Sequence, residues 1–510
     1  MSCYEYHKRE NETRTLLEIL QEAGIYQNAP CNGQGRCGKC VVRFLEKAPE
    51  AGAQEKRLLG AEKIEAGYRL ACLCHPKESG QIDLLQEEEQ IQAEIYWRGA
   101  ENPFGTRTTE RAEEKSYGIA IDIGTTTIAG ILAECHSGAI LQSAAMINHQ
   151  RIYGADVISR IQASNEGKKW EMQRCIRQDL KRIVAELLEK EKLGMEQIQS
   201  IAVAGNTTMC HLLRGFSCET LGVAPFIPVD ISVMEGDAAA ILGMKEMHAK
   251  TVIAPGISAF VGADITAGLV VNKKFEDGFW HLFLDIGTNG EMALGNENRI
   301  YTTSTSAGPA LEGGNISCGM ASVPGAISHV TIGEDGKTQL TVIGEKEPTG
   351  ICGTGIVDLA YELWKHRIID ENGTLVEAYF EKGYPLTEQI FFTQRDLREL
   401  QMAKAAICAG IRVLMAKAGI TMDEIRDCTL AGGFGTQMRI ESAAGIGLFP
   451  KELEEKVFSA GNTVLEGLRQ YLTGEIKKED WMRLAERAVE VNLAKEPEFD
   501  KIYMHEMNFY

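Results

Sequence analysis

The sequence lacks any apolar run close to the roughly 18 residues that a membrane-spanning helix needs. Its first residues also lack the apolar core of a secretory signal. Basic residues are in the minority, because 53 Lys and Arg stand against 72 Asp and Glu, giving a net charge of −19. Such a chain repels nucleic acid and anionic lipid. We therefore expect a cytoplasmic protein with no nucleic-acid or membrane partner.

Two common nucleotide-binding signatures are also missing. The chain contains no G-x-x-x-x-G-K-[ST] and no G-x-G-x-x-G coupled to a strand, so neither a P-loop nor a Rossmann site is supported. The length of 510 residues exceeds what one core can organise and predicts two to four domains. An apolar fraction of 44% and a charged fraction of 25% are typical of a globular protein.

The most informative stretch is a loop rich in cysteine and glycine. It reads Cys31-Asn-Gly-Gln-Gly-Arg-Cys37-Gly-Lys-Cys40, and Cys72 and Cys74 follow after a gap. Two irons bridged by two sulfides need four thiolates, and a short loop can supply only three of them. Glycines let the loop curl tightly and direct N–H groups at anionic sulfurs. The pattern predicts a [2Fe–2S] cluster held by the three loop cysteines and one later thiol.

Three alternatives to the cluster explain the cysteines less well. Structural zinc usually takes two C-x2-C pairs, and only Cys37 and Cys40 form one. A disulfide framework is disfavoured in a chain this large without a secretory signal, and ordinary buried thiols would not gather at glycine-flanked positions. The fourth ligand stays open at this point, because Cys72 and Cys74 would share one face if their segment is extended.

The loop and the segment Arg69-Leu-Ala-Cys72 resemble vertebrate-type and bacterial [2Fe–2S] ferredoxins. The resemblance implies Cys72 as the fourth ligand, with Cys74 in reserve, and an α+β ferredoxin-like β-grasp domain over residues 1–88. Only about fourteen residues precede the first predicted helix, so we expect the opening strands to be short or partly missing. Residues 89–116 are polar and charged and predict a linker. The linker suits a ferredoxin domain that swings, and a rigidly docked domain is the alternative.

A short motif then occurs twice. Asp122-Ile-Gly-Thr and Asp285-Ile-Gly-Thr each end a predicted strand and enter a tight turn before a second strand. Two copies predict a duplicated fold with one phosphate-binding loop in each half, whereas a single copy would pass for an ordinary glycine hairpin. Asp122 and Asp285 could hold Mg²⁺ through water. The candidate nucleotide-binding residues of these turns are Gly124, Thr125, Thr126 and Thr127, and Gly287, Thr288, Asn289 and Gly290.

A third glycine turn follows another buried strand. Asp427-Cys-Thr-Leu-Ala-Gly432-Gly433-Phe434-Gly435 places backbone where the adenosine of ATP would lie in a two-lobed nucleotide fold. The alternative is a tight strand-to-helix turn without a ligand.

The three segments together resemble the ASKHA superfamily, the α/β fold of acetate and sugar kinases, Hsp70 and actin. The resemblance implies a first lobe over residues 117–282 and a second lobe over residues 283–510. It also places Asp264 in the cleft, where this residue could orient the attacking water. A helix N-terminal Asp that stabilises the helix dipole is the rival explanation and is slightly favoured.

Several further motifs resemble the reductive activators of corrinoid proteins. They are Asn148-His-Gln-Arg151, Gly154-Ala-Asp156-Val-Ile-Ser-Arg160, Gly205-Asn-Thr-Thr-Met209, Ser306-Ala-Gly-Pro-Ala-Leu-Glu312 and Gly350-Ile-Cys-Gly-Thr-Gly355. Taken singly, the Gly205 motif reads as a strand turn and Glu312 as a solvated or capping carboxylate.

This resemblance implies a function. A corrinoid activator uses ATP and one electron from its cluster to return inactive Co(II) corrinoid protein of a methyltransferase system to Co(I). The cofactors would be the [2Fe–2S] cluster, ATP and Mg²⁺, and an external low-potential donor would supply electrons. The alternatives are an activator of another radical enzyme and a nucleotide-dependent redox sensor. The sequence does not fix the oligomeric state, and a homodimer is left open.

Overall fold

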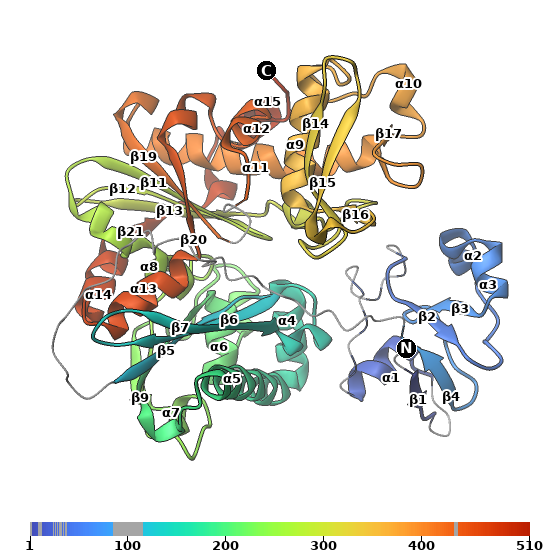
Figure 1. Ribbon diagram of the computed structural model, residues 1–510. Helices are drawn as coiled ribbons and strands as arrows, with labels where there is room; N and C mark the ends of the chain where they lie inside the picture. Colours follow the sequence, from blue (N-terminus) through green and yellow to red (C-terminus); the bar gives the residue numbers. More distant parts are fainter. Residues whose placement is uncertain are drawn as a thin grey trace.

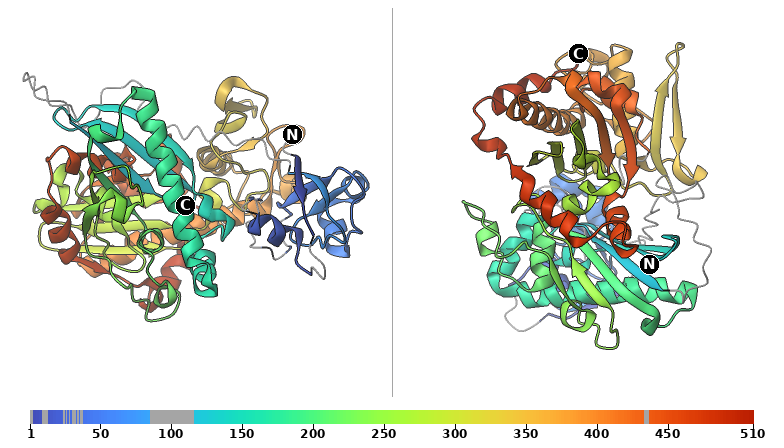
Figure 2. Two further views of the ribbon diagram at one scale, coloured as in Figure 1. Left: turned by 90° about the horizontal axis from the view of Figure 1, so that it is seen from below. Right: turned by 90° about the vertical axis from the view of Figure 1, so that its left-hand side faces the viewer.

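The computed structural model describes residues 3–8, 13–23, 25, 27, 29, 33, 35, 38–84, 116–432 and 437–510, except for the side chain of Asn272. Cys31, Cys37, Gly433, Phe434 and residues 89–115 of the predicted linker lie outside the described residues. Figure 1 shows an N-terminal domain beside a larger body of two lobes, and the two turned views of Figure 2 show the same division.

The N-terminal domain is a four-stranded antiparallel sheet with a short helix packed on it. Its strands run in the order β1-β4-β2-β3. Their bounds, and those of the helices between them, are β1 (Cys3–Tyr6), α1 (Leu16–Glu22), β2 (Val41–Phe44), α2 (Ala53–Leu59), α3 (Ala61–Glu65), β3 (Tyr68–Leu70) and β4 (Gly80–Asp83). The expected short opening strand is confirmed, because β1 has four residues and pairs directly with β4. Thr15 caps α1, and Leu16, Leu17 and Leu20 are buried beneath it.

Each of the two lobes is built on a six-stranded sheet. The first lobe contains β5 (Tyr117–Ile123), β6 (Thr127–Glu134), β7 (Ile140–Ile147), α4 (Val157–Ala163), α5 (Lys169–Glu191), β8 (Ile198–Gly205), α6 (Thr207–Arg214), β9 (Met234–Asp237), α7 (Ala238–Ile241), β10 (Lys250–Ile253) and α8 (Ala263–Leu269). The chain continues through β11 (Trp280–Ile286), β12 (Gly290–Gly295), β13 (Ile300–Thr305), β14 (Ala326–Ile332), β15 (Thr338–Val342), β16 (Gly350–Ile351), α9 (Gly353–Lys365), α10 (Glu377–Phe380), β17 (Tyr384–Pro385), β18 (Phe391–Phe392) and α11 (Gln394–Ala418). It ends with β19 (Ile425–Ala431), α12 (Ile440–Gly445), β20 (Val457–Gly461), α13 (Thr463–Leu472), α14 (Lys478–Arg487), β21 (Ala488–Glu490) and α15 (Phe499–Glu506).

The two large sheets repeat one topology. The first sheet runs β7-β6-β5-β8-β10 and ends with the edge strand β9. The second sheet begins with the edge strand β21 and continues in the matching order β13-β12-β11-β19-β20. Asp122 of β5 lies beside Ala204 of the parallel strand β8, and Asp285 of β11 lies beside Ala431 of the parallel strand β19. The duplication predicted from the two Asp-Ile-Gly-Thr copies is therefore confirmed, and both Asp side chains lie at equivalent strand ends.

The C-terminal part of the chain returns to the first lobe. Side chains of α13 and α14, among them Leu465, Leu468 and Trp481, are buried in the same core as β5 and β8, and Figure 1 shows both helices beside α8. At Gly467 an added Cβ would lie 1.8 Å from the carbonyl oxygen of Ala267, so α13 and α8 touch backbone to backbone. The lobe boundary predicted at residue 282 does not divide the cores, because the core of the first lobe also contains side chains of α13 and α14.

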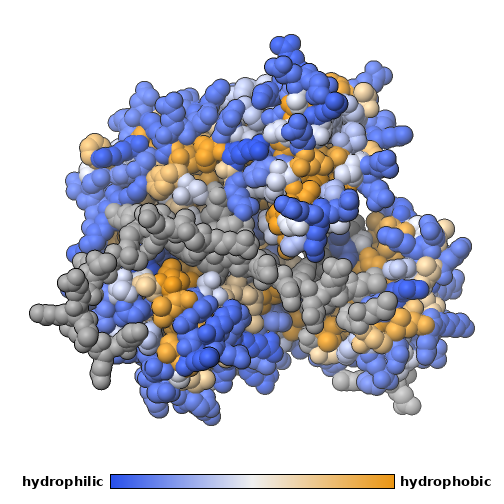
Figure 3. Space-filling model, viewed as in Figure 1, coloured by the Kyte–Doolittle hydropathy of each residue, from blue (hydrophilic) through white to orange (hydrophobic). Residues whose placement is uncertain are grey.

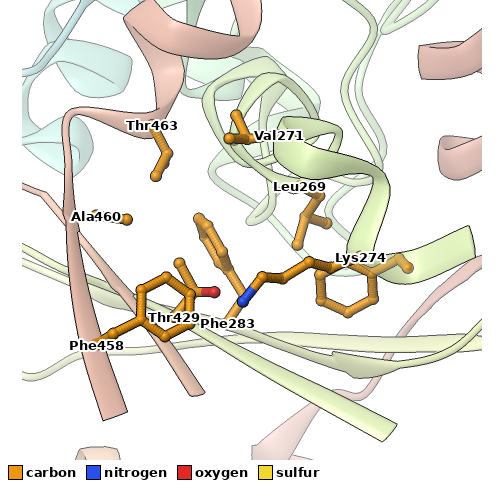
Figure 4. Close-up of a pocket in the computed structure, with 10 residues that line it drawn as sticks. Leu269, Val271, Lys274, Phe283, Thr429, Phe458, Ala460 and Thr463 are labelled. Atoms are coloured by element: carbon orange, nitrogen blue, oxygen red, sulfur yellow. The ribbon is translucent and has the colours of Figure 1, made fainter. Parts of the chain in front are cut away.

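The lobes meet through a tightly filled junction. A cavity of about 10 Å³ lies where the 3₁₀ helix Val271–Glu276 packs on β19 and β20, room for about one water molecule. Figure 4 shows Lys274 lying over Phe458 there, and its Nζ is 3.7 Å from the ring centre and 3.1 Å from Asp427 Oδ1. A cavity of this size is too small to hold a nucleotide.

His281 extends this network and makes its stability dependent on pH. Its Nδ1 lies 3.1 Å from Asp427 Oδ1, and its Nε2 lies 2.9 Å from Asp277 Oδ1. Burial alone would lower the pKa of His281, but the hydrogen bonds and charges of Asp427 and Asp277 outweigh it and raise the pKa. The stability from this group is full below the unfolded pKa of about 6.5 and is lost as pH rises through the higher folded pKa.

His281→Gln is therefore expected to lower stability by about 1–3 kcal/mol at pH 6, because it removes the charged hydrogen bonds of the buried imidazole to Asp427 and Asp277, and by less at pH 9. Thermal melting at the two pH values measures the difference. His248→Gln, at an exposed histidine, is the control and should cost the same small amount at both. A deficit for His281→Gln that does not change with pH would contradict the assignment.

Candidate functional site

The described glycines of the cysteine loop adopt the left-handed conformation that favours glycine. Gly33, Gly35 and Gly38 have φ of +77°, +71° and +68°, values that L side chains rarely adopt. The sulfurs of Cys40 and Cys72 lie 3.3 Å apart, and both residues are buried. Two adjacent thiols beside a tightly curled loop fit the donor set of an iron–sulfur cluster.

The local fold separates the two candidate fourth ligands. Glu55 Oε1 accepts a hydrogen bond of 2.8 Å from Leu70 N–H and so fixes the end of β3 just before Cys72. Burial and the charge of Glu55 raise the pKa of Cys74 to about 12, although Arg69 opposes them. The sulfur of Cys72, in contrast, adjoins that of Cys40. This geometry favours Cys72.

The two phosphate loops follow β5 and β11 as tight turns. Gly124 N–H donates to Thr127 O at 3.0 Å, and Gly287 N–H donates to Asn289 O at 2.9 Å. A Cβ at Gly124 would lie 2.6 Å from Thr127 O, so only glycine fits that turn. The predicted strand, turn and strand are thus observed in both copies.

Three aspartates gather between the lobes. Burial and the charges of Asp264 and Asp122 raise the pKa of Asp285 to about 7. Burial also raises the pKa of Asp122 to about 7, against the hydrogen bond of 3.0 Å that Asn462 Nδ2 donates to its Oδ2. Burial raises the pKa of Asp264 to about 6. Since each affects another's pKa, the fold brings all three predicted catalytic residues to one cleft.

The sequence offers two explanations for Asp264, a carboxylate at a helix N-terminus and a residue that faces the cleft. It lies in the first turn of α8, and its Oδ1 accepts a hydrogen bond of 2.9 Å from Ile265 N–H. Its charge also raises the pKa values of Asp122 and Asp285. The side chain therefore lies at the helix end and near Asp122 and Asp285, and a role in orienting water stays a prediction.

Two glutamates of the cleft were not predicted as site residues. Glu291 is the cross-strand partner of Asp285, and burial together with the charges of Asp264 and Asp285 raises its pKa well above the usual value. Glu312 Oε2 accepts a hydrogen bond of 2.7 Å from Thr288 Oγ1, so Glu312 reaches the second phosphate loop and is more than a solvated carboxylate. Hairpin register could have identified Glu291, because a two-strand turn places it opposite Asp285.

The described residues contain no group of three His, Cys, Asp or Glu side chains arranged to bind a metal ion directly. Mg²⁺ commonly keeps several waters and binds through one or two carboxylates and phosphate oxygens. The aspartates of this cleft fit that mode, in which Asp122 and Asp285 would act through water.

The third glycine turn touches the same cleft. Gly432 has φ of +89°, and its N–H donates to Gly461 O at 3.0 Å. A Cβ on Gly432 would lie 2.8 Å from Asp285 Oδ1. The turn predicted to bind adenosine therefore begins directly against Asp285, which the sequence order alone did not reveal.

These features define a class: an iron–sulfur domain joined to an ASKHA-type nucleotide-binding body. The sequence matches the 2Fe-2S iron-sulfur cluster binding domain over residues 5–77, the RACo middle region over residues 117–275 and the C-terminal ASKHA domain of RACo over residues 279–510. It is 33% identical to the corrinoid activation enzyme RamQ of Eubacterium limosum, with 96% of this chain and 95% of the relative covered. The chain belongs to the RACo family.

Two further comparisons agree with this assignment. The chain is 24% identical to a [Co(II) methylated amine-specific corrinoid protein] reductase of Methanosarcina barkeri, over 77% of each protein. A solved structure of a reductive activator for corrinoid,iron-sulfur protein superposes with a TM-score of 0.70 and 27% identity, covering 99% of this chain and 98% of that one. The predicted ferredoxin-plus-ASKHA architecture is therefore confirmed.

Among the described residues, no helix has both the length and the apolar character required to cross a membrane. Figure 3 shows hydrophilic side chains over most of the face that it draws.

Proposed function

We propose that this protein is an ATP-dependent reductive activase. It passes one electron from its [2Fe–2S] centre to an inactive Co(II) corrinoid protein of a methyltransferase system and so restores Co(I). The observation that carries the proposal is the presence, in one chain, of the adjoining thiols Cys40 and Cys72 and of a two-loop cleft lined by Asp122, Asp264 and Asp285. RamQ, similar over nearly its whole length, is named for corrinoid activation.

The residues divide into two sets of roles. Cys31, Cys37, Cys40 and Cys72 hold the cluster, which when bound supplies one electron at low potential, about −400 mV for plant-type centres. The turns at Gly124 and Gly287 bind phosphate through N–H and hydroxyl groups, and Gly432, Gly433 and Phe434 bind adenosine. Asp122 and Asp285 hold Mg²⁺ through water, and Asp264 orients the water that attacks the γ-phosphate.

ATP is needed because Co(II) corrinoid is harder to reduce than such a donor can readily drive. Closure of the two lobes on ATP would change the docking surface or the axial ligation of cobalt and so shift the equilibrium through differential binding. An external low-potential donor would reload the protein after each transfer.

Anaerobic mixing tests the proposal. Reduced protein is combined with Co(II) corrinoid protein, with and without Mg-ATP, while the absorbance of Co(I) is followed. We expect Co(I) to accumulate over many equivalents per chain only with Mg-ATP. Equal Co(I) formation without ATP would contradict the proposal, and a single equivalent per chain would favour the redox sensor.

An activator of another radical enzyme is the second candidate. Known systems of that kind hold a [4Fe–4S] cluster between subunits through cysteines of the ASKHA domain and have no N-terminal ferredoxin. The match to the 2Fe-2S iron-sulfur cluster binding domain over residues 5–77 therefore favours the first candidate.

A further inference from the structure

Three motifs that the proposed chemistry leaves unused meet behind the first phosphate loop. Arg160 Nη2 donates to Thr125 O at 2.6 Å, and Asn148 Nδ2 donates to Gly124 O at 2.9 Å. The backbone N–H of Asn148 donates to Thr126 O at 2.9 Å. Three successive carbonyl groups of the loop are thus bound on one side by two residues.

These bonds determine the direction in which the loop presents its donors. In a planar trans peptide the C=O of one residue points opposite to the N–H of the next. Because the carbonyls of Gly124 and Thr125 point back to Asn148 and Arg160, the N–H groups of Thr125 and Thr126 point the other way. Successive N–H groups that point to one side form an anion-binding concavity.

The local sequence places Arg160 at this position. Asp156 caps α4, because its Oδ1 accepts a hydrogen bond of 2.7 Å from Ser159 N–H. Arg160 is the next residue along this helix. Arg160 Nε donates to Gly154 O at 3.0 Å, and its side chain is fully buried. A Cβ on Gly154 would lie 2.8 Å from Arg160 N, so the motif requires glycine there.

The third motif supports the same loop from α6. Asn206 Oδ1 caps this helix by accepting from Met209 N–H at 3.0 Å, while its Nδ2 donates to Thr125 Oγ1 at 2.9 Å. The sulfur of Met209 lies 3.2 Å from Arg160 Nη1 and 3.6 Å from Asn148 Nδ2. Both donors are therefore held in place by one side chain.

We propose that Arg160 and Asn148 are positioning residues for the phosphates of ATP. They hold the first loop with its N–H groups toward the cleft, and the permanent charge of Arg160 polarises those peptides and favours an anion in front of them. This inference rests on the proposed use of ATP.

The test measures nucleotide affinity and turnover in the full-length protein with its cluster in place. For Arg160→Met we expect Mg-ATP to bind at least about 10-fold more weakly and ATP turnover to fall on the order of 100-fold, because the loop is no longer held. Arg160→Lys should recover part of the loss, since lysine can reach one of the two carbonyls. Titration calorimetry gives the affinity, and steady-state kinetics separates KM from kcat.

A second variant keeps the test independent of the folding of the first. Asn148→Asp should impair binding more than Asn148→Ala, because a carboxylate oxygen would face the carbonyl of Gly124. Equal affinities for the two Asn148 variants would count against the proposal.

Arg214→Met is the matched control. Arg214 is also almost buried, and it donates to Asp230 O at 2.9 Å in the same lobe, so its loss should lower stability and leave Mg-ATP affinity unchanged. Wild-type affinity in Arg160→Met, or an equal loss in Arg214→Met, would overturn the inference. A wild-type protein that neither binds nor hydrolyses ATP would instead refute the proposed function.

Discussion

Gly432→Ala is expected to abolish ATP-dependent formation of Co(I) and to leave the spectrum of the cluster unchanged. The new Cβ would lie 2.8 Å from Asp285 Oδ1 and 3.2 Å from Ile286 O, distances at which neighbouring atoms must shift. The backbone at φ +89° adds strain of roughly 1–3 kcal/mol for a non-glycine residue. A displaced Asp285 would spoil the cleft, and a misplacement near 1 Å costs on the order of 100-fold in rate. The rate of Co(I) formation with Mg-ATP measures the effect.

Gly419→Ala separates the effect of the clash from that of backbone strain. Gly419 also has positive φ, +70°, but its added Cβ would meet nothing within 4 Å. This variant should lose a similar amount of stability and keep its ATP-dependent activity. If Gly432→Ala also kept full activity, the adenosine segment would not belong to the working cleft.

Cys72→Ala is expected to remove the cluster entirely, whereas Cys74→Ala should keep it. Cys72 offers a sulfur 3.3 Å from that of Cys40, and alanine provides no ligand atom in its place. Cys74 is buried, and burial together with the charge of Glu55 raises its pKa to about 12. Iron analysis and the EPR signal after dithionite addition measure the outcome, with about two irons per chain in wild type and Cys74→Ala.

The opposite pattern would reassign the fourth ligand. If Cys72→Ala kept its rhombic EPR signal and Cys74→Ala lost it, Cys74 of the segment after Leu70 would have to be the fourth ligand. A colourless wild-type protein with stoichiometric zinc would refute the cluster itself.

Local sequence was enough to predict the parts of the site that are built from contiguous residues. The cysteine loop, the two Asp-Ile-Gly-Thr turns and the turn at Gly432 each combine a strand end with glycine, and their short-range chemistry determines the backbone. The repeated motif also predicted that the two lobes share one sheet topology, because each copy ends a strand and enters a turn before a second strand.

The residues that sequence reasoning missed depend on contacts between distant segments. Glu312 reaches Thr288 only because a 3₁₀ helix follows β13, and Asn462 meets Asp122 across 340 positions. The roles of Asn148 and Arg160 behind Gly124 and Thr125 likewise appear only after α4 packs. Hydrophobic periodicity and short motifs contain no information about such contacts, so the sequence did not assign these side chains a role in the site.

The return of α13 and α14 to the first lobe bears on how the chain matures. A ribosome releases β5, β8 and α8 long before it has made Leu465, Leu468 and Trp481, which share their core. At about 5–20 residues per second, the nascent first lobe waits many seconds with that apolar surface uncovered. The N-terminal domain has a separate core and can fold at once, whereas the ATP-binding body can be completed only when nearly all of the polypeptide has emerged.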